Sequence, residues 1–132
     1  MVLVDTSVWV DFFRGIASKE RKILHQLLES NEEIGLCGLI KQEILQGVSN
    51  DLQYQKIKNY LENFIYFDFR DPEHFEMAAT LYRNCRKKGK TPRKIIDCLI
   101  AAVAISNGLP VLHKDHDFDL IAQCNPLKIY NS

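Results

Sequence analysis

The chain has 132 residues, of which 46% are hydrophobic and 26% charged, and this composition predicts one globular domain over residues 1–132. Its 17 Lys and Arg balance 17 Asp and Glu, which excludes a uniformly basic protein of the kind that coats nucleic acid. The apolar runs are shorter than the roughly 20 residues of a membrane span. The opening Met1-Val2-Leu3-Val4-Asp5 also lacks the order of a secretory signal, so we predict a cytoplasmic protein without membrane contact.

Short apolar runs and amphipathic segments alternate along the chain. Residues 2–4 predict a buried strand, and the apolar period that follows predicts a helix over residues 6–14. Ser18 is placed to cap a second helix that ends near Glu29. The further strands are predicted, in chain order, at residues 34–37, 65–69, 110–112 and 127–130. The further helices are predicted at residues 39–48, 51–64, 72–87 and 91–107.

This alternation predicts an α/β fold with a central, mainly parallel sheet of about five strands and helices on both faces. Ligand sites in such sheets lie outside the carboxyl ends of the strands. The cysteines follow no C-x-x-C spacing, and we expect all of them to be reduced: Cys37, Cys85, Cys98 and Cys124.

Two acidic residues stand out early in the chain. Asp5 follows the first predicted strand directly, where an ordinary alternative is that Asp5 or Thr6 simply caps the next helix. Glu43 falls inside the apolar arc of its predicted helix, between Leu39 and Ile40 on the helical wheel. An acid on the core side of a helix loses hydration unless it is paired, protonated or bound to a metal.

Asp97 shows the same conflict more strongly. It is the single carboxylate in the run 95–104, which is otherwise apolar on all sides, and Ala101 and Ala104 leave room beside it. The alternative is a core acid satisfied by a buried Arg or by amides at a helix end.

A third acidic group follows the strand predicted at residues 110–112. Asp115, Asp117 and Asp119 alternate behind the strand end, where they could ligate a divalent cation or simply form a solvated turn. Converging carboxylates repel one another unless a cation holds them ionised, and carboxylate oxygens favour Mg²⁺ or Mn²⁺. Such a site suits phosphate chemistry by metal-activated water.

These acids and their neighbours resemble those of the PIN-domain nucleases, and among them the VapC-type toxins of VapBC toxin-antitoxin pairs. The likeness covers nearly the whole chain, so it implies one PIN domain over residues 1–132 with a PIN-like three-layer fold. The matching segments are Val4-Asp5-Thr6-Ser7-Val8-Trp9, Ile40-Lys41-Gln42-Glu43-Ile44-Leu45-Gln46-Gly47, Ile96-Asp97-Cys98-Leu99-Ile100-Ala101-Ala102 and His113-Lys114-Asp115-His116-Asp117-Phe118.

The resemblance implies an Mg²⁺- or Mn²⁺-dependent endoribonuclease toxin that hydrolyses RNA, often structured RNA such as tRNA. It also implies a homodimer held inactive by a cognate VapB-type antitoxin. Carried over by position, the catalytic acids and metal ligands are Asp5, Glu43, Asp97 and Asp115. Thr6, Ser7 and Asp117 are expected to support the metal or its waters.

The last acidic segment leaves the choice of the fourth acid open and departs from the family pattern at one position. Asp117 competes with Asp115 as the fourth acid, and we prefer Asp115 because Asp115-His116-Asp117-Phe118 fits the pattern Asp-x-Asp-Phe with the first Asp in the site. His113 stands where many relatives have Thr or Ser. The His113 and His116 pair is interpreted as polar surface, because neutral His suits Zn²⁺ better than a hard cation.

A basic segment precedes Asp97. Residues 77–96 contain seven Lys and Arg and no acid, which is also typical of a solvated helix end. Its position beside Asp97 favours contact with an RNA backbone. The residues predicted to bind RNA are Arg86, Lys87, Lys88, Lys90, Arg93 and Lys94.

Two other functions fit a small α/β domain with clustered acids. A signalling receiver domain needs a phospho-accepting Asp after a central strand, and the placement of Glu43 and Asp97 on apolar helices disfavours it. A catalytically silent binding module with a PIN fold is disfavoured because the acids are intact.

Overall fold

The computed structural model describes residues 1–131, which form four strands and seven helices. The strands are β1 (Val2–Val4), β2 (Ile34–Cys37), β3 (Ile65–Phe67) and β4 (Val111–Leu112). The helices are α1 (Thr6–Arg14), α2 (Lys19–Glu29), α3 (Gly38–Gln46), α4 (Asp51–Leu61), α5 (Glu73–Lys87), α6 (Ile95–Ser106) and α7 (His116–Cys124). None of the helices in residues 1–131 combines the length and the hydropathy that a bilayer-spanning helix requires.

The strands form one parallel sheet in the order β3-β2-β1-β4, and this confirms the predicted α/β fold. The strand predicted at residues 127–130 is reduced to a single parallel bridge between Val111 and Ile129. Successive residues of a strand direct their backbone N–H and C=O groups toward opposite neighbouring strands. In a two-residue strand, one residue therefore bonds to each neighbour. Val111 therefore bonds outward to Lys128 and Tyr130, while Leu112 accepts a hydrogen bond from Asp5 in β1's continuation.

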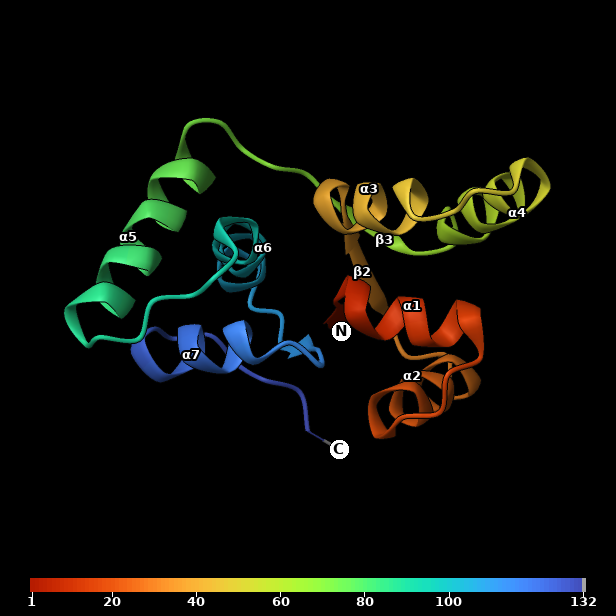
Figure 1. Ribbon diagram of the computed structural model, residues 1–132, viewed down its shortest axis with the longest axis horizontal. Helices are drawn as coiled ribbons and strands as arrows, with labels where there is room; N and C mark the ends of the chain where they lie inside the picture. The colour runs from red at the N-terminus through yellow and green to blue at the C-terminus, as the bar shows by residue number, and fades with distance from the viewer. Residues whose placement is uncertain (132) are drawn as a thin grey trace.

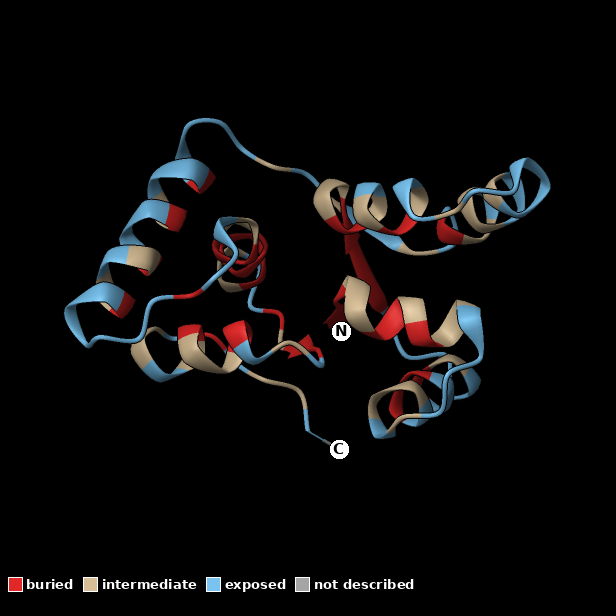
Figure 2. Cartoon of the chain, in the orientation of Figure 1, coloured by how far each residue is buried: buried red, intermediate tan, exposed pale blue. Residues whose placement is uncertain are grey.

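The sheet separates two layers of helices. In Figure 1, α1 and α2 lie on one side of the strands and α5, α6 and α7 on the other. α3 packs against both α1 and α6 and so bridges the two layers. Figure 2 shows that burial concentrates on β1, β2 and β4 and on α6, where Ile100 and residues 101–104 are buried, whereas Ile65 and Tyr66 of β3 are exposed.

Two predicted elements near the acids differ from the structure. The helix predicted from Thr91 begins only at Ile95, because the backbone amides of Arg93 and Lys94 donate to Asp117 and hold the chain extended before α6. α7 was not predicted at all. The remaining boundaries differ by a few residues at element ends, and all four cysteines are free, as predicted.

α7 starts within the acidic segment that the sequence interpretation treated as a ligand group or a turn. Asp115 is its N-cap and accepts a hydrogen bond from the Asp117 backbone amide at 3.0 Å. Phe118 and Ile121 are buried and Ala122 is partly buried, at the spacing of an amphipathic helix. The acids thus sit at a helix N-terminus, where negative charge is favourable.

Candidate metal centre

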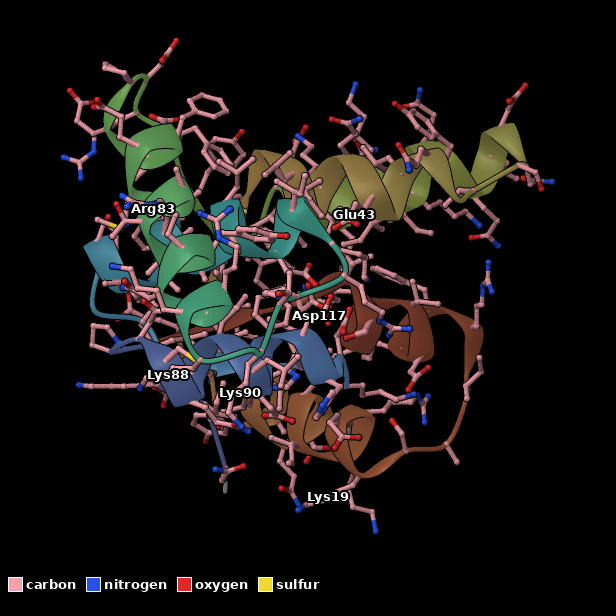
Figure 3. All side chains as sticks on the ribbon, turned by 60° about the vertical axis from the view of Figure 1, so that its left-hand side comes forward. Lys19, Glu43, Arg83, Lys88, Lys90 and Asp117 are labelled. Atoms are coloured by element: carbon pink, nitrogen blue, oxygen red, sulfur yellow. The ribbon has the colours of Figure 1, made fainter. Side chains whose placement is uncertain are left out.

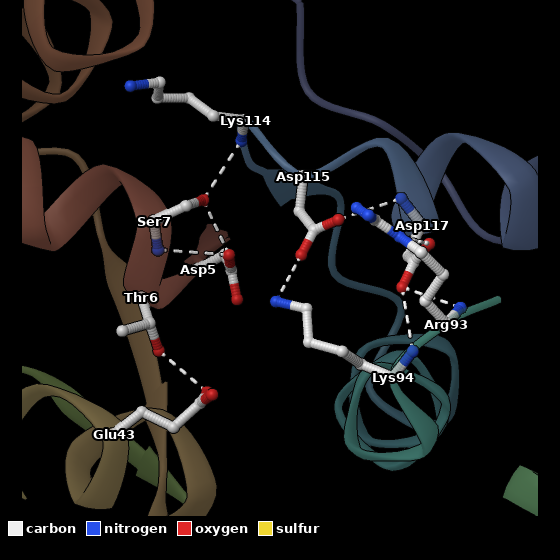
Figure 4. A network of polar contacts seen from close by, with 9 residues as sticks. All are labelled: Asp5, Thr6, Ser7, Glu43, Arg93, Lys94, Lys114, Asp115 and Asp117. Atoms are coloured by element: carbon white, nitrogen blue, oxygen red, sulfur yellow. Dashed lines mark hydrogen bonds and ion pairs between the residues drawn. The ribbon is translucent and has the colours of Figure 1, made fainter.

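The carboxyl ends of β1 and β4 bring the first and last acidic segments together. The Asp5 backbone amide donates to the Leu112 carbonyl at 2.9 Å, so Asp5 lies beside the start of the segment that carries Asp115. The Asp5 side chain is buried and its Oδ2 accepts from the Ser7 amide at 3.1 Å and the Ser7 hydroxyl at 2.7 Å. Ser7 Oγ accepts in turn from the Lys114 amide at 3.1 Å. The Ser7 hydroxyl therefore connects the residues that follow β1 and β4 through hydrogen bonds (Figure 4).

Asp97 enters the same region from the first turn of α6. It is only 2% exposed, and its Oδ2 is a buried oxygen without a hydrogen-bond partner among the described residues. Burial, followed by the charge of Asp5, raises the pKa of Asp97 to about 8, against the opposing charge of Lys94. A buried carboxyl oxygen left unpaired costs free energy, and a cation would remove that cost.

Asp97, Asp115 and Asp117 each offer an oxygen, and the three atoms lie within 4.8 Å of one another. Asp117 is fully buried, and its Oδ2 accepts from the backbone amides of Arg93 and Lys94, both at 3.0 Å. That oxygen is committed to positioning the start of α6. Asp115 uses Oδ1 as the α7 cap, and Oδ2 lies 2.5 Å from the Lys94 ammonium. In each of these two acids one oxygen therefore accepts from backbone amides, and the other is paired with the Lys94 or Arg93 side chain.

Burial acts to raise the pKa of Asp115, but hydrogen bonds from Lys94 and from the Asp117 amide outweigh it and hold that pKa below its ordinary value. The pKa values of Asp97 and Asp115 are therefore shifted in opposite directions. The Asp97 carboxyl holds its proton near neutral pH, and the Asp115 carboxyl is ionised. This separation of the two pKa values is typical of functional carboxyl groups.

Glu43 stands at the edge of this group. It is half-buried on α3, and its Oε1 accepts from the Thr6 hydroxyl at 3.0 Å. The structure therefore places it less deeply than the helical wheel suggested. Figure 4 shows Glu43 and Thr6 on the α1 and α3 side, across from Asp115 and Asp117. Glu43 is not part of the cluster formed by Asp97, Asp115 and Asp117.

A buried ion pair that was not predicted from the sequence joins α1 to the segment that carries Asp115. Asp11 on α1 is buried, and its Oδ2 lies 2.5 Å from the ammonium of Lys114. Burial acts to raise the pKa of Asp11, but contacts with Lys114 and Ser18 outweigh it and lower that pKa. The signal was present, because Ser7 and Asp11 are four residues apart and share one face of α1.

His113 does not join the candidate ligands. Its side chain is nearly buried, its ring packs at 5.2 Å from that of Phe118, and its Nε2 lies 3.2 Å from Asp119. His116 is exposed. The interpretation of His113 as polar surface is therefore wrong, because it follows β4 directly and packs beneath α7 instead of facing solvent.

The basic segment lies along α5 and the chain that follows it. Figure 3 places Arg83, Lys88 and Lys90 on one side of Asp117, with Glu43 on the other. The predicted RNA-binding residues are all exposed: Arg86, Lys87, Lys88, Lys90, Arg93 and Lys94. Cationic side chains thus border the carboxylates on the α5 side.

The donor set fits a hard divalent cation. Carboxylate oxygens from Asp97, Asp115 and Asp117 converge without cysteine or histidine, and the orphaned Oδ2 of Asp97 is buried. Asp5 lies close enough for its charge to raise the pKa of Asp97. Mg²⁺ and Mn²⁺ prefer such oxygen ligands. The arrangement can hold an ion against a phosphate group brought to its open, basic side.

Comparisons with known proteins agree with this geometry. A family model described as "PIN domain" matches residues 2–123. Ribonuclease VapC11 of Mycobacterium tuberculosis is 38% identical over 129 residues, which are 97% of this chain and 96% of that protein.

Two solved structures share the fold. VapBC2 from Rickettsia felis, bound to a DNA fragment from their promoter, has a TM-score of 0.76 at 19% identity, covering 100% of this chain and 99% of that chain. A toxin-antitoxin complex from Klebsiella pneumoniae has a TM-score of 0.69 at 23% identity, covering 98% and 100% of the two chains.

Proposed function

This chain belongs to the PIN-domain family, among the VapC ribonucleases, and we propose that it is a metal-dependent endoribonuclease acting as the toxin of a toxin-antitoxin pair. The observation that carries the metal site is the buried, unpartnered Oδ2 of Asp97 beside the oxygens of Asp115 and Asp117. The family match over residues 2–123 supports a single PIN domain over residues 1–132.

We assign the acids different roles by their contacts. Asp97 and Asp115, whose oxygens lie within 4.8 Å of each other, and Asp5, whose charge acts on Asp97, are the direct ligands of one Mg²⁺ or Mn²⁺. Glu43 acts through water because it lies outside that cluster, on α3 beside Thr6. Ser7 fixes the Asp5 carboxylate. Thr6 orients Glu43, and Asp117 orients the start of α6.

An ion held by these acids would activate water for attack on phosphorus and neutralise the charge that develops on the leaving oxygen. The chain itself supplies position and charge. The exposed Lys and Arg of the α5 side would hold the RNA backbone across the carboxylates, because phosphate contacts fix the register of a nucleic acid without reading its sequence.

The test is cleavage of RNA, with tRNA among the substrates, by purified protein with Mg²⁺ or Mn²⁺. We expect Asp5→Asn and Asp97→Asn to lose nearly all activity, because each removes a ligand charge. The matched control is Asp51→Asn, an exposed acid at the start of α4, which should cut like the native protein. Equal activity of all four proteins would identify a contaminating nuclease and overturn the proposal.

The toxin role implies a partner. We propose a VapB-type antitoxin that presents Arg or Lys to the carboxylates, since charge-assisted hydrogen bonds would satisfy them. The toxin-antitoxin complex that shares this fold supports such a partner. We also propose a homodimer, to be tested by light scattering. Growth arrest on expression, relieved by Asp97→Asn and by coexpression of the neighbouring antitoxin gene, is the expected outcome in cells.

The family membership favours this function over a receiver domain. A receiver would form an acyl phosphate, so labelling with a small phosphodonor is expected to leave this protein unmodified. A catalytically silent module would fail to bind Mn²⁺ or to cut RNA.

A further inference from the structure

Lys94 is anchored in the candidate metal centre at both ends. Its backbone amide donates to Asp117 Oδ2 at 3.0 Å, and its ammonium lies 2.5 Å from Asp115 Oδ2. It directly precedes α6, three residues before Asp97. The position of its side chain is therefore set by the same acids that are proposed to hold the cation.

The ammonium lies among several carboxylates. The hydrogen bond with Asp115, supported by the charges of Asp97 and Asp5, raises the pKa of Lys94, so the side chain stays charged. Figure 4 shows the Lys94 side chain reaching into the space between Asp5 and Asp115. The ammonium thus provides the positive charge that a divalent cation would bring to the same oxygens.

Both oxygens of Asp115 have partners. Oδ1 accepts the Asp117 amide as the α7 cap, and Oδ2 holds Lys94. A divalent cation on either oxygen of Asp115 would be repelled by the ammonium that lies 2.5 Å from Oδ2, so cation binding favours the displacement of Lys94. The Lys94 side chain is 51% exposed, while that of Asp115 is 11% exposed, so the lysine can leave toward solvent without opening the core.

We propose, on the basis of the nuclease function above, that Lys94 is an internal competitor for the catalytic cation and becomes a phosphate contact once displaced. It weakens metal binding in the free protein. On the metal-loaded protein, the released ammonium stands at the edge of the carboxylate cluster, where the RNA backbone arrives. One side chain therefore has opposite effects on metal affinity and on turnover.

The test measures Mn²⁺ binding to metal-free protein without RNA, by calorimetry or by electron paramagnetic resonance. We expect Lys94→Met and Lys94→Gln to bind Mn²⁺ about tenfold more tightly than the native protein. Lys94→Arg keeps the charge and should bind close to the native affinity. The control Lys90→Met removes a charge from the same basic segment, and Lys90 has no ion pair with the acids in residues 1–131, so its Mn²⁺ affinity should be unchanged.

Turnover gives the second measurement. With saturating Mn²⁺, Lys94→Met should cut RNA with a lower kcat while needing less metal for half-maximal rate, a split that a purely structural lysine would not produce. Unchanged or weaker Mn²⁺ binding by both Lys94→Met and Lys94→Gln would overturn the competitor role and leave the nuclease function standing. Failure of every variant and the native protein to bind Mn²⁺ would overturn both proposals.

Discussion

Replacing Asp97 by asparagine should stabilise the metal-free protein in a pH-dependent way. The folded chain raises the pKa of Asp97 from the ordinary 3.8 to about 8, chiefly by burial. Between these two values the folded protein binds a proton that the unfolded chain has released, so stability falls as pH rises through this window. The amide side chain of the Asp97→Asn variant does not titrate, so the variant should not show this fall.

The size of the effect follows from the width of the window. Each pKa unit corresponds to about 1.4 kcal/mol, so the whole window is worth about 6 kcal/mol, and the part of it from about pH 5 to about pH 8 gives about 4 kcal/mol as a ceiling. Rearrangement of Lys94 and water toward an ionised carboxylate reduces this. We expect the variant to gain about 2 kcal/mol over the native protein across that pH range, or about 6–10 °C in Tm for a domain of this size.

The assay is thermal unfolding in EDTA at several pH values, followed by the same series with Mg²⁺. A ligand that binds the folded state stabilises it, so Mg²⁺ should raise the Tm of the native protein and leave Asp97→Asn almost unchanged. The order of the two proteins should then reverse at saturating metal. A variant that is less stable than the native protein by a constant amount at every pH would refute the reasoning, because it would show that Asp97 is an ordinary ionised core partner.

The remaining predictions concern the groups around the acids. Ser7→Ala removes one hydrogen bond that Ser7 donates and one that it accepts from the Lys114 amide, and should cost about 1–2 kcal/mol in urea unfolding and lower Mn²⁺ affinity. Asp11→Asn leaves Lys114 without its buried counter-ion and should lower the free energy of unfolding by about 1–3 kcal/mol. The Mn²⁺ affinity of this variant should fall as well. A loss of stability with unchanged Mn²⁺ affinity would show that Asp11 does not position the metal ligands. The pair Lys88→Gln and Lys90→Gln should weaken RNA binding and reduce the slope of log affinity against log salt by about 1.4, while Mn²⁺ affinity stays the same. An unchanged salt slope would contradict the assigned RNA path.

The positions of the candidate acids could be predicted because each conflicts with its local pattern. Asp97 interrupts an apolar helix, and Asp5 ends a buried strand. Both positions imply a desolvation cost for the carboxylate, which a bound cation or another partner must offset. The parallel sheet follows from alternating short apolar runs, and it places strand ends on one edge. Neither inference needs a long-range contact to be known in advance.

The partners of those acids could not be predicted in the same way. The late start of α6 depends on amides of Arg93 and Lys94 bonding to Asp117, more than twenty residues along the chain. Thr91 and Pro92 form a sound local start signal, but the buried carboxylate competes successfully for the amides. α7 is a different case, because Asp115 is an ordinary N-cap and the helix could have been predicted from Phe118 and its spacing.

The zero net charge of the chain conceals an exchange of charge within the site. Asp97 keeps a proton near neutral pH, and Lys94 brings one ammonium to Asp115. Together these supply two positive charges, the same charge as one divalent cation. Entry of Mg²⁺ therefore replaces positive charge among the acids instead of adding it, so affinity depends on how readily the proton and the ammonium leave. The ammonium leaves toward the basic side of the carboxylate cluster, where it adds to the charge that an RNA phosphate meets.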